Sequence, residues 1–127
     1  MTINNKPLVF IVEDNIAYRM LISRVLQNKG FMVMVFENGR KAADMLQHIK
    51  PKLIVSDIEM PRMDGFEFKD YVRRNFEDTI PFIYLSSVTN EEVKERAQLL
   101  GATKMLKKPV SPDDLKQTID EVLNKCY

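Results

Sequence analysis

Residues 53–65 read LIVSDIEMPRMDG, and this stretch gives the strongest indication of the fold. It opens with three apolar residues, and Asp57 follows them without a glycine-containing turn signal in between. The pattern predicts a buried strand that carries a carboxylate at its end. Because an ionised side chain is costly to bury unless it is paired or used, Asp57 is the first candidate for a functional residue.

Four more short apolar runs occur along the chain, and we expect each of them to form a strand. They cover residues 8–12, 31–36, 82–85 and, more weakly, 105–106. Short unbroken apolar runs are typical of parallel strands whose two faces are both covered. Lysines flank the last run, which is typical of a protected edge strand.

Five helical patterns alternate with these runs, each with apolar residues three or four positions apart, which places them on one face of a helix. Each has a start or stop signal: a glycine or proline after its end, a capping box, or a serine cap followed by proline. The signal residues, in chain order, are Gly30, Pro51, Asp64 with Glu67, Gly101, and Ser111 with Pro112. This strict alternation predicts one α/β domain over residues 1–127, with a parallel sheet and helices on both faces.

The composition limits the classes of function. The chain has 127 residues, 45% of them apolar, and a net charge of +1 with no long run of one sign. One core is therefore expected, and no nucleic-acid or membrane surface is indicated. The apolar runs are too short to cross a bilayer and the N-terminus lacks a signal-peptide pattern, so we expect a cytoplasmic protein. The single Cys126 excludes an internal disulfide, and His48 is expected at the solvated surface.

Polar residues follow four of the predicted strands. In an open parallel sheet, ligands bind past the carboxyl ends of the strands, so these residues are expected at one rim. They are Glu13, Asp14 and Asn15; Asp57 and Glu59; Ser86 and Ser87; and Lys107, Lys108 and Pro109. Each group alone has a plain structural interpretation, such as a helix cap, or a capping box of Thr89 with Glu92 in the fourth loop. Their convergence on one rim indicates a site.

Carboxylates gathered there would repel one another, by about 4 kcal/mol for a pair 4 Å apart at an effective dielectric near 20. Carboxylate oxygens from separate loops suit Mg²⁺, and Lys108 would supply a second positive charge. With an ordinary pKa of about 3.9, Asp57 would be ionised at neutral pH and able to attack phosphorus. Ser86 would then donate a hydrogen bond to the phosphoryl group.

Four motifs together resemble the receiver domain of response regulators in two-component signalling, the CheY-like domain, over essentially the whole chain. They are VEDN at 12–15, SDIEMPRMDG at 56–65, PFIYLSS at 81–87 and KKP at 107–109. The resemblance implies a flavodoxin-like (βα)5 fold, with five parallel strands in the order 2-1-3-4-5.

The resemblance also implies a role for each site residue. Asp57 would be the phosphoacceptor, Ser86 the hydroxyl that moves toward the phosphoryl group, and Lys108 the lysine that pairs with it. A cis peptide would precede Pro109. The implied Mg²⁺ ligands are Asp14 and Asp57 directly, the backbone carbonyl of Glu59, and Glu13 through water.

The function implied is a switch and not an enzyme, apart from self-phosphorylation and slow autodephosphorylation. A sensor histidine kinase or phosphotransfer protein would donate the phosphoryl group. Phosphorylation would then shift the balance between two conformations of the face formed by the fourth helix, fifth strand and fifth helix. That face would control a protein partner or output domain. Kinase docking is expected to include Ile16, Met20 and Val110. Met105 stands at the switch position where the family usually has an aromatic residue.

Three alternatives remain open from the sequence. Met105 favours a receiver-shaped interaction module that is never phosphorylated. Asp57 with Glu59 resembles the acid pair of small aspartate-nucleophile phosphatases, although those have a second aspartate and a cap domain. A flavin carrier is the weakest alternative, because the first loop is acidic and a flavin phosphate needs a hydroxyl- and glycine-rich cradle.

Overall fold

The computed structural model describes residues 2–3, 6–59, 63–75, 80–87, 91–99 and 104–124. Its strands are β1 (Thr2–Ile3), β2 (Lys6–Val12), β3 (Met32–Phe36), β4 (Leu53–Asp57), β5 (Phe82–Ser86) and β6 (Lys104–Lys107). Its helices are α1 (Ile16–Asn28), α2 (Gly39–Leu46), α3 (Gly65–Asn75), α4 (Glu91–Leu99) and α5 (Pro112–Asn124). Within the described residues, no helix combines the length and the apolar character that crossing a bilayer requires.

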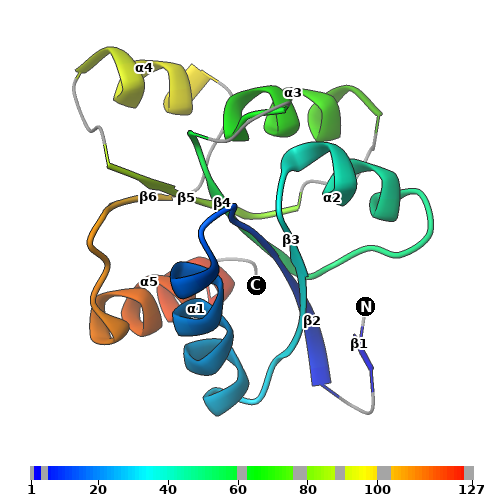
Figure 1. Ribbon diagram of the computed structural model, residues 1–127, viewed down its shortest axis with the longest axis vertical. Coiled ribbons are helices and arrows are strands. Elements are labelled where there is room, and N and C mark those ends of the chain that lie inside the picture. The colour runs from blue at the N-terminus through cyan, green and yellow to red at the C-terminus, as the bar shows by residue number, and fades with distance from the viewer. Residues whose placement is uncertain are drawn as a thin grey trace.

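Strands β2 to β6 form a parallel sheet in the order β3-β2-β4-β5-β6 (Figure 1). This confirms the predicted fold and its strand order. The structure adds β1, which pairs antiparallel with the start of β2 through Thr2↔Pro7 and Ile3↔Lys6. A two-residue strand is too short to show a sequence period, which is why it was not predicted.

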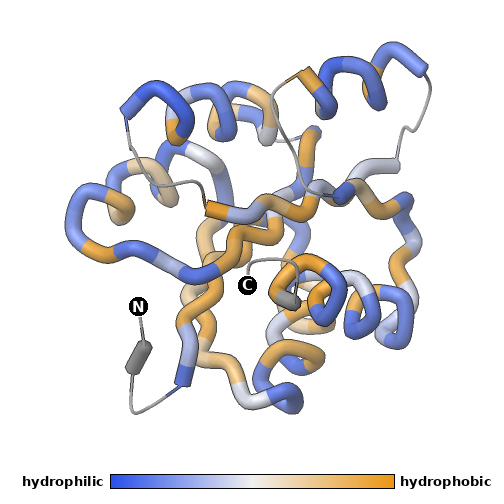
Figure 2. Tube along the Cα trace, turned by 180° about the vertical axis from the view of Figure 1, so that it is seen from behind, coloured by the Kyte–Doolittle hydropathy of each residue, from blue (hydrophilic) through white to orange (hydrophobic). Residues whose placement is uncertain are grey.

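The core consists of two apolar layers, one on each face of the sheet. Along β2, Leu8, Phe10 and Val12 belong to the layer that contains α2 and α3, whereas Val9 and Ile11 belong to the layer that contains α1 and α5. Figure 2 shows the hydrophobic strands at the centre and hydrophilic positions on the outer helices. Because side chains alternate along a strand, a run that is apolar at every position is buried on both faces.

Most of the predicted helix signals act as expected. The Glu67 N–H donates to Asp64 Oδ1 at 2.8 Å and the Asp64 N–H donates to Glu67 Oε1 at 3.3 Å, which is a reciprocal capping box. Ser111 Oγ accepts from the Asp114 N–H at 3.0 Å. Gly30 has a φ of 90°, the left-handed conformation that glycine favours after a helix.

One helix end differs from the prediction. The apolar stripe that includes Ile49 predicts a helix up to Pro51, but α2 ends at Leu46. The His48 N–H donates to the Met45 carbonyl at 2.9 Å, which is a tighter turn than an α-helix. Ile49 still packs against the core, so the apolar period continues past the helix. The signals at Gly101 and Thr89, and also Cys126, lie outside the described residues.

Candidate functional site

Three carboxylates meet at the carboxyl end of the sheet. Glu13 and Asp14 follow β2 and Asp57 ends β4, and these two strands are paired neighbours. One carboxylate oxygen from each of the three residues lies within 4.8 Å of the others. Glu13 is 0% exposed and Asp57 2%, whereas Asp14 is exposed. The cluster therefore has a buried floor and one acid at its open side.

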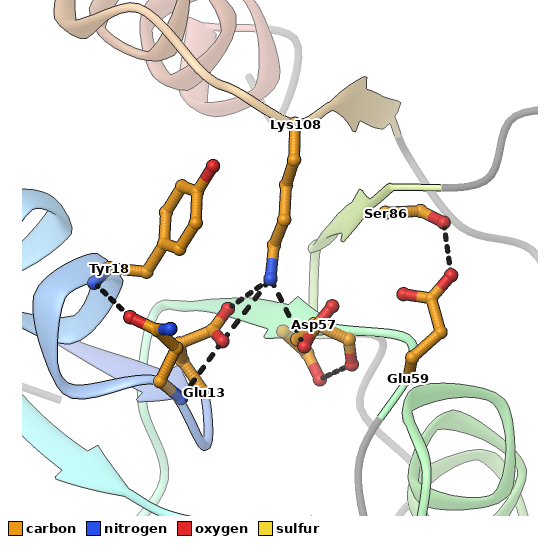
Figure 3. A network of polar contacts seen from close by, with 8 residues as sticks. Glu13, Tyr18, Asp57, Glu59, Ser86 and Lys108 are labelled. Carbon is orange, nitrogen blue, oxygen red and sulfur yellow. Dashed lines mark hydrogen bonds and ion pairs between the residues drawn. The ribbon is translucent and has the colours of Figure 1, made fainter.

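Lys108 reaches this cluster from the loop after β6. Its Nζ lies 3.0 Å from Glu13 Oε2 and 3.2 Å from Asp57 Oδ2 (Figure 3). It also donates a hydrogen bond to Glu13 Oε1 at 3.2 Å. The ammonium thus bridges the two buried acids, and it compensates part of the repulsion between them.

Two contacts hold Lys108 in place. Its backbone N–H donates to the Ser86 carbonyl at 2.8 Å, which fixes the start of the loop beside β5. Its Nζ also lies 4.5 Å from the centroid of the Tyr18 ring on α1, within cation–π range. The Lys108–Pro109 peptide is cis, as the resemblance implied.

The buried charges perturb one another. Burial, with the charge of Glu13 adding to it, raises the pKa of Asp57 to about 7, although Lys108 acts in the opposite direction. Burial also raises the pKa of Glu13 against the hydrogen bond and charge of Lys108. For Lys108, burial alone would lower the pKa, but its hydrogen bonds and ion pairs with the two acids raise it overall. The ordinary pKa that the sequence led us to expect is therefore wrong for Asp57 when only the protein's own side chains surround it.

One oxygen of Asp57 is left without a hydrogen bond. Asp57 Oδ1 is buried and has no hydrogen-bond partner among the described residues, while Oδ2 faces Lys108. Glu13 Oε2 is ion-paired with Lys108 but also lacks a well-aligned hydrogen bond. A buried carboxylate oxygen in this state is costly, and a hard cation would relieve the cost. The three carboxylates thus fit a site for Mg²⁺; the part predicted for the Glu59 carbonyl stays a prediction.

Gly65, the last residue of the SDIEMPRMDG motif, packs directly on the end of β4. A Cβ at this position would lie 2.4 Å from the Asp57 carbonyl oxygen. The Gly65 N–H donates to the Ile58 carbonyl at 2.9 Å, and its own carbonyl accepts from the Tyr84 hydroxyl at 3.2 Å. Glycine is needed because only it allows α3 to start this close to the phosphoacceptor candidate. This contact was not predicted, because the spacing of the motif does not show how close the two segments lie.

Ser86 ends β5 beside the cluster, as predicted, and its side chain is directed toward Glu59 (Figure 3). The Ser86 hydroxyl donates to Glu59 Oε1 at 2.7 Å. The sequence predicted a role for the Glu59 backbone carbonyl in metal binding, but it did not predict this contact between the two side chains. Ser87 is exposed and takes no part in the cluster.

The residues expected to dock a kinase separate into two groups. Ile16 and Met20 on α1 are 65% and 55% exposed, and they line a groove of about 330 Å³ together with Val35 of β3. Val110 is only 8% exposed because it packs in the layer with α1 and α5. The expectation that Val110 offers a docking surface is therefore wrong. Met105, at the switch position, is half-buried and pairs in register with Tyr84.

Comparison with known proteins adds to this geometry. A sequence profile described as the response regulator receiver domain matches residues 9–120. The chain belongs to the response-regulator receiver family. Receiver domains bind Mg²⁺ at an acidic pocket, and in this receiver domain Glu13, Asp14 and Asp57 form such a pocket.

This receiver domain is similar to proteins of several architectures. It is 32% identical to the probable chemotaxis protein CheY of Rhizobium etli, covering 96% of each chain. It matches the structure of chemotaxis response regulator CheY4 of Vibrio cholerae with a TM-score of 0.86 and 34% identity, over 93% of this chain and 99% of that one. It is 33% identical to hybrid signal transduction histidine kinase D of Dictyostelium discoideum, over 89% of this chain but only 7% of that longer protein.

Proposed function

We propose that this receiver domain, acting as a single unit over residues 1–127, accepts a phosphoryl group on Asp57 and thereby switches the face formed by α4, β6 and α5. The observation that carries the proposal is the buried Asp57 Oδ1. It has no hydrogen-bond partner among the described residues, and two further acids and Lys108 surround it. When ionised, such an oxygen can act as a nucleophile, and the Lys108 ammonium is already placed to compensate the negative charge of a phosphoryl group.

The transfer would exchange one bond to phosphorus for another. Asp57 Oδ1 attacks the phosphorus of a phosphohistidine on a sensor kinase or phosphotransfer protein and forms an acyl phosphate. The phosphorus–nitrogen bond breaks and its electron pair stays on that ring nitrogen. Because the other ring nitrogen of the phosphohistidine carries a proton, the histidine leaves as neutral imidazole. Because the transfer needs an ionised carboxylate, the raised pKa of Asp57 must be lowered as the site fills.

The residues that would hold Mg²⁺ are Asp14 and Asp57, with the Glu59 carbonyl and with Glu13 acting through water. When bound, Mg²⁺ supplies a hard positive charge that favours the ionised form of Asp57 and neutralises phosphoryl oxygens. Lys108 would keep its ion pair with Glu13 and exchange its contact with Asp57 Oδ2 for one with the phosphoryl group. Lys108 and the proposed metal site are thus two places where positive charge would compensate the negative charge of the phosphoryl group.

Partners are proposed from the surfaces beside the site. The exposed Ile16 and Met20 would dock the phosphodonor next to the mouth of the acidic pocket. On the opposite side, Leu99 at the end of α4 is 78% exposed and would belong to the face that meets a downstream protein or output domain. The similarity to receiver segments of hybrid histidine kinases supports a kinase as donor. We place this exchange in the cytoplasm, as expected from the sequence.

The proposal is tested by incubating the protein with a small-molecule phosphodonor and Mg²⁺ and measuring its intact mass. One added phosphoryl group is expected, with none in Asp57→Asn or after chelation of the metal. Modification that survives either change would contradict the proposal. Sustained turnover of a phosphate ester would favour a phosphatase instead, and partner binding that is unaffected by Asp57→Asn would favour an unphosphorylated interaction module.

A further inference from the structure

We propose that the Glu59 side chain is a positioning residue that competes with the phosphoryl group on Asp57 for the hydroxyl proton of Ser86. This inference rests on the proposed function and deepens it. It assigns to Glu59 a role distinct from that of its backbone carbonyl, and it makes the resting position of Ser86 part of the switch.

The geometry of the pair supports this role. Ser86 Oγ donates to Glu59 Oε1 at 2.7 Å, within the range of a charge-assisted hydrogen bond between a hydroxyl and a carboxylate. Ser86 is 0% exposed at the end of β5, whereas Glu59 is exposed in the segment after β4. Figure 3 shows the two side chains directed toward each other, beside Asp57. The hydrogen bond therefore joins the ends of two neighbouring strands at the rim of the site.

The competition follows from the chemistry of a hydroxyl group. Ser86 has one O–H proton, which it donates to one strong acceptor at a time. Glu59 and a phosphoryl group are both anionic acceptors, so either can form a charge-assisted hydrogen bond with it. When Ser86 turns to the phosphoryl group, it must first give up Glu59. Part of the energy gained at the phosphoryl group is spent in breaking the resting contact.

The cost of that exchange is set by where each acceptor lies. Glu59 is exposed, so water replaces Ser86 as its donor once the contact breaks. The oxygens that a phosphoryl group presents on Asp57 would lie beside a residue that is 2% exposed, where water is a poorer substitute. The exchange is therefore favourable after phosphorylation and unfavourable before it. Glu59 holds the unmodified protein in its resting arrangement and raises the threshold for switching.

Glu59 also has a second effect that must be separated from the first. Its negative charge acts on Asp57, where it contributes to the raised pKa, and it would repel a phosphoryl group whatever Ser86 does. Removing Glu59 relieves both effects, but only the competition requires the Ser86 hydroxyl. A double-mutant cycle between the two positions therefore isolates it.

The experiment measures binding of beryllium fluoride, a mimic of a phosphoryl group on a carboxylate, in the presence of Mg²⁺. The proteins are wild type, Glu59→Ala, Glu59→Gln, Ser86→Ala and the double variant Glu59→Ala/Ser86→Ala. Glu59→Ala is expected to tighten binding about tenfold where Ser86 is intact. Glu59→Gln should have an intermediate effect, because its amide oxygen still accepts but carries no charge. In the Ser86→Ala background, Glu59→Ala should tighten binding by only about twofold, through charge alone.

An equal effect of Glu59→Ala in both backgrounds would overturn the competition and leave a purely electrostatic role. A loss of binding in Glu59→Ala would also overturn it. Failure of the proposed function has a different signature, since wild type and Asp57→Asn would then bind the probe alike or not at all. Circular dichroism and urea unfolding of each variant check that all of them fold, so that a change in affinity is measured on native protein.

Discussion

The Lys108 ammonium lies 3.2 Å from Asp57 Oδ2, while Asp57 Oδ1 has no hydrogen-bond partner among the described residues. The two oxygens of one carboxylate are thus in different environments. One is compensated by a cation of the chain, and the other is buried without compensation. The uncompensated oxygen therefore destabilises the folded protein when the site holds no ligand. A ligand that supplies positive charge or hydrogen-bond donors would remove this destabilisation.

Replacing the carboxylate should therefore stabilise the protein when no divalent cation is added. Folded Asp57 has a pKa of about 7, above its ordinary value of 3.8, so it binds a proton more tightly than in the unfolded chain. Raising the pH through that window favours unfolding. We expect Asp57→Asn to increase the free energy of unfolding by about 1–2 kcal/mol at pH 8 and by much less near pH 4. Urea unfolding with EDTA across this pH range measures the difference between Asp57→Asn and the wild type in free energy of unfolding. A difference that does not depend on pH would contradict the raised pKa of Asp57.

Magnesium should remove the same penalty by a different route. A ligand that binds only the folded state stabilises it by about 2.7 kcal/mol at a concentration a hundredfold above its Kd. Thermal unfolding of the wild type should shift upward with MgCl₂, compared with NaCl at matched ionic strength. Asp14→Asn removes a proposed ligand from the exposed side of the site and should abolish most of the shift.

Asp113→Asn is the matched control for that measurement. Asp113 is exposed in the first turn of α5 and lies outside the acidic cluster. The magnesium-dependent shift should be unchanged in this variant. A shift that Asp14→Asn leaves intact, or that Asp113→Asn also removes, would show that magnesium acts on the general surface charge.

Loss of the lysine should have the opposite effect to loss of Asp57. Lys108→Met keeps the length of the side chain but leaves Glu13 and Asp57 buried without their cation. We expect a loss of about 3 kcal/mol in the free energy of unfolding at neutral pH. Adding Asp57→Asn should restore more than the roughly 1–2 kcal/mol that it contributes when Lys108 is present, because without Lys108 the charge that it removes has no cation to compensate it.

The neighbouring Lys107→Met is the control, since Lys107 is exposed and should cost less than about 0.5 kcal/mol. Urea unfolding of the single and double variants gives the interaction energy. If the effects of Lys108→Met and Asp57→Asn simply add, the bridge is not energetically coupled and the account of the buried charges is wrong.

The fold could be predicted almost completely because its signals are local and repeated. Apolar runs such as Leu8–Val12 are buried on both faces, and the capping box of Asp64 with Glu67 forms as its spacing indicates. Ile49 shows the limit of this reasoning. Its apolar period reflects burial, which a turn satisfies as well as a helix does, so the end of α2 was placed too late.

The site could be predicted as a set of residues but not as an arrangement. Parallel strands bring their carboxyl ends to one rim, so Glu13, Asp14 and Asp57 were expected together. The pKa of Asp57 depends on how deeply it is buried and on its distance from neighbouring charges, neither of which can be read from the sequence. The turn of the Ser86 hydroxyl toward Glu59 is a choice among rotamers, and it too needs coordinates.

Val110 illustrates a third limit. An apolar residue in a loop suits either a docking surface or the core, and the sequence offers no means of choosing. In the structure Val110 packs with Leu115 and the rest of its layer and is 8% exposed, whereas Ile16 remains 65% exposed. The exposed apolar side chains beside the site are therefore on α1, and Val110 is not one of them.

The most direct test of the central claim is to locate the phosphoryl group after incubation with a small-molecule phosphodonor and Mg²⁺. Peptide mapping by mass spectrometry should find the modification on Asp57, and hydroxylamine should remove it because an acyl phosphate reacts with that nucleophile. A modification on any other residue, or one that resists hydroxylamine, would contradict the assignment of Asp57 as the acceptor.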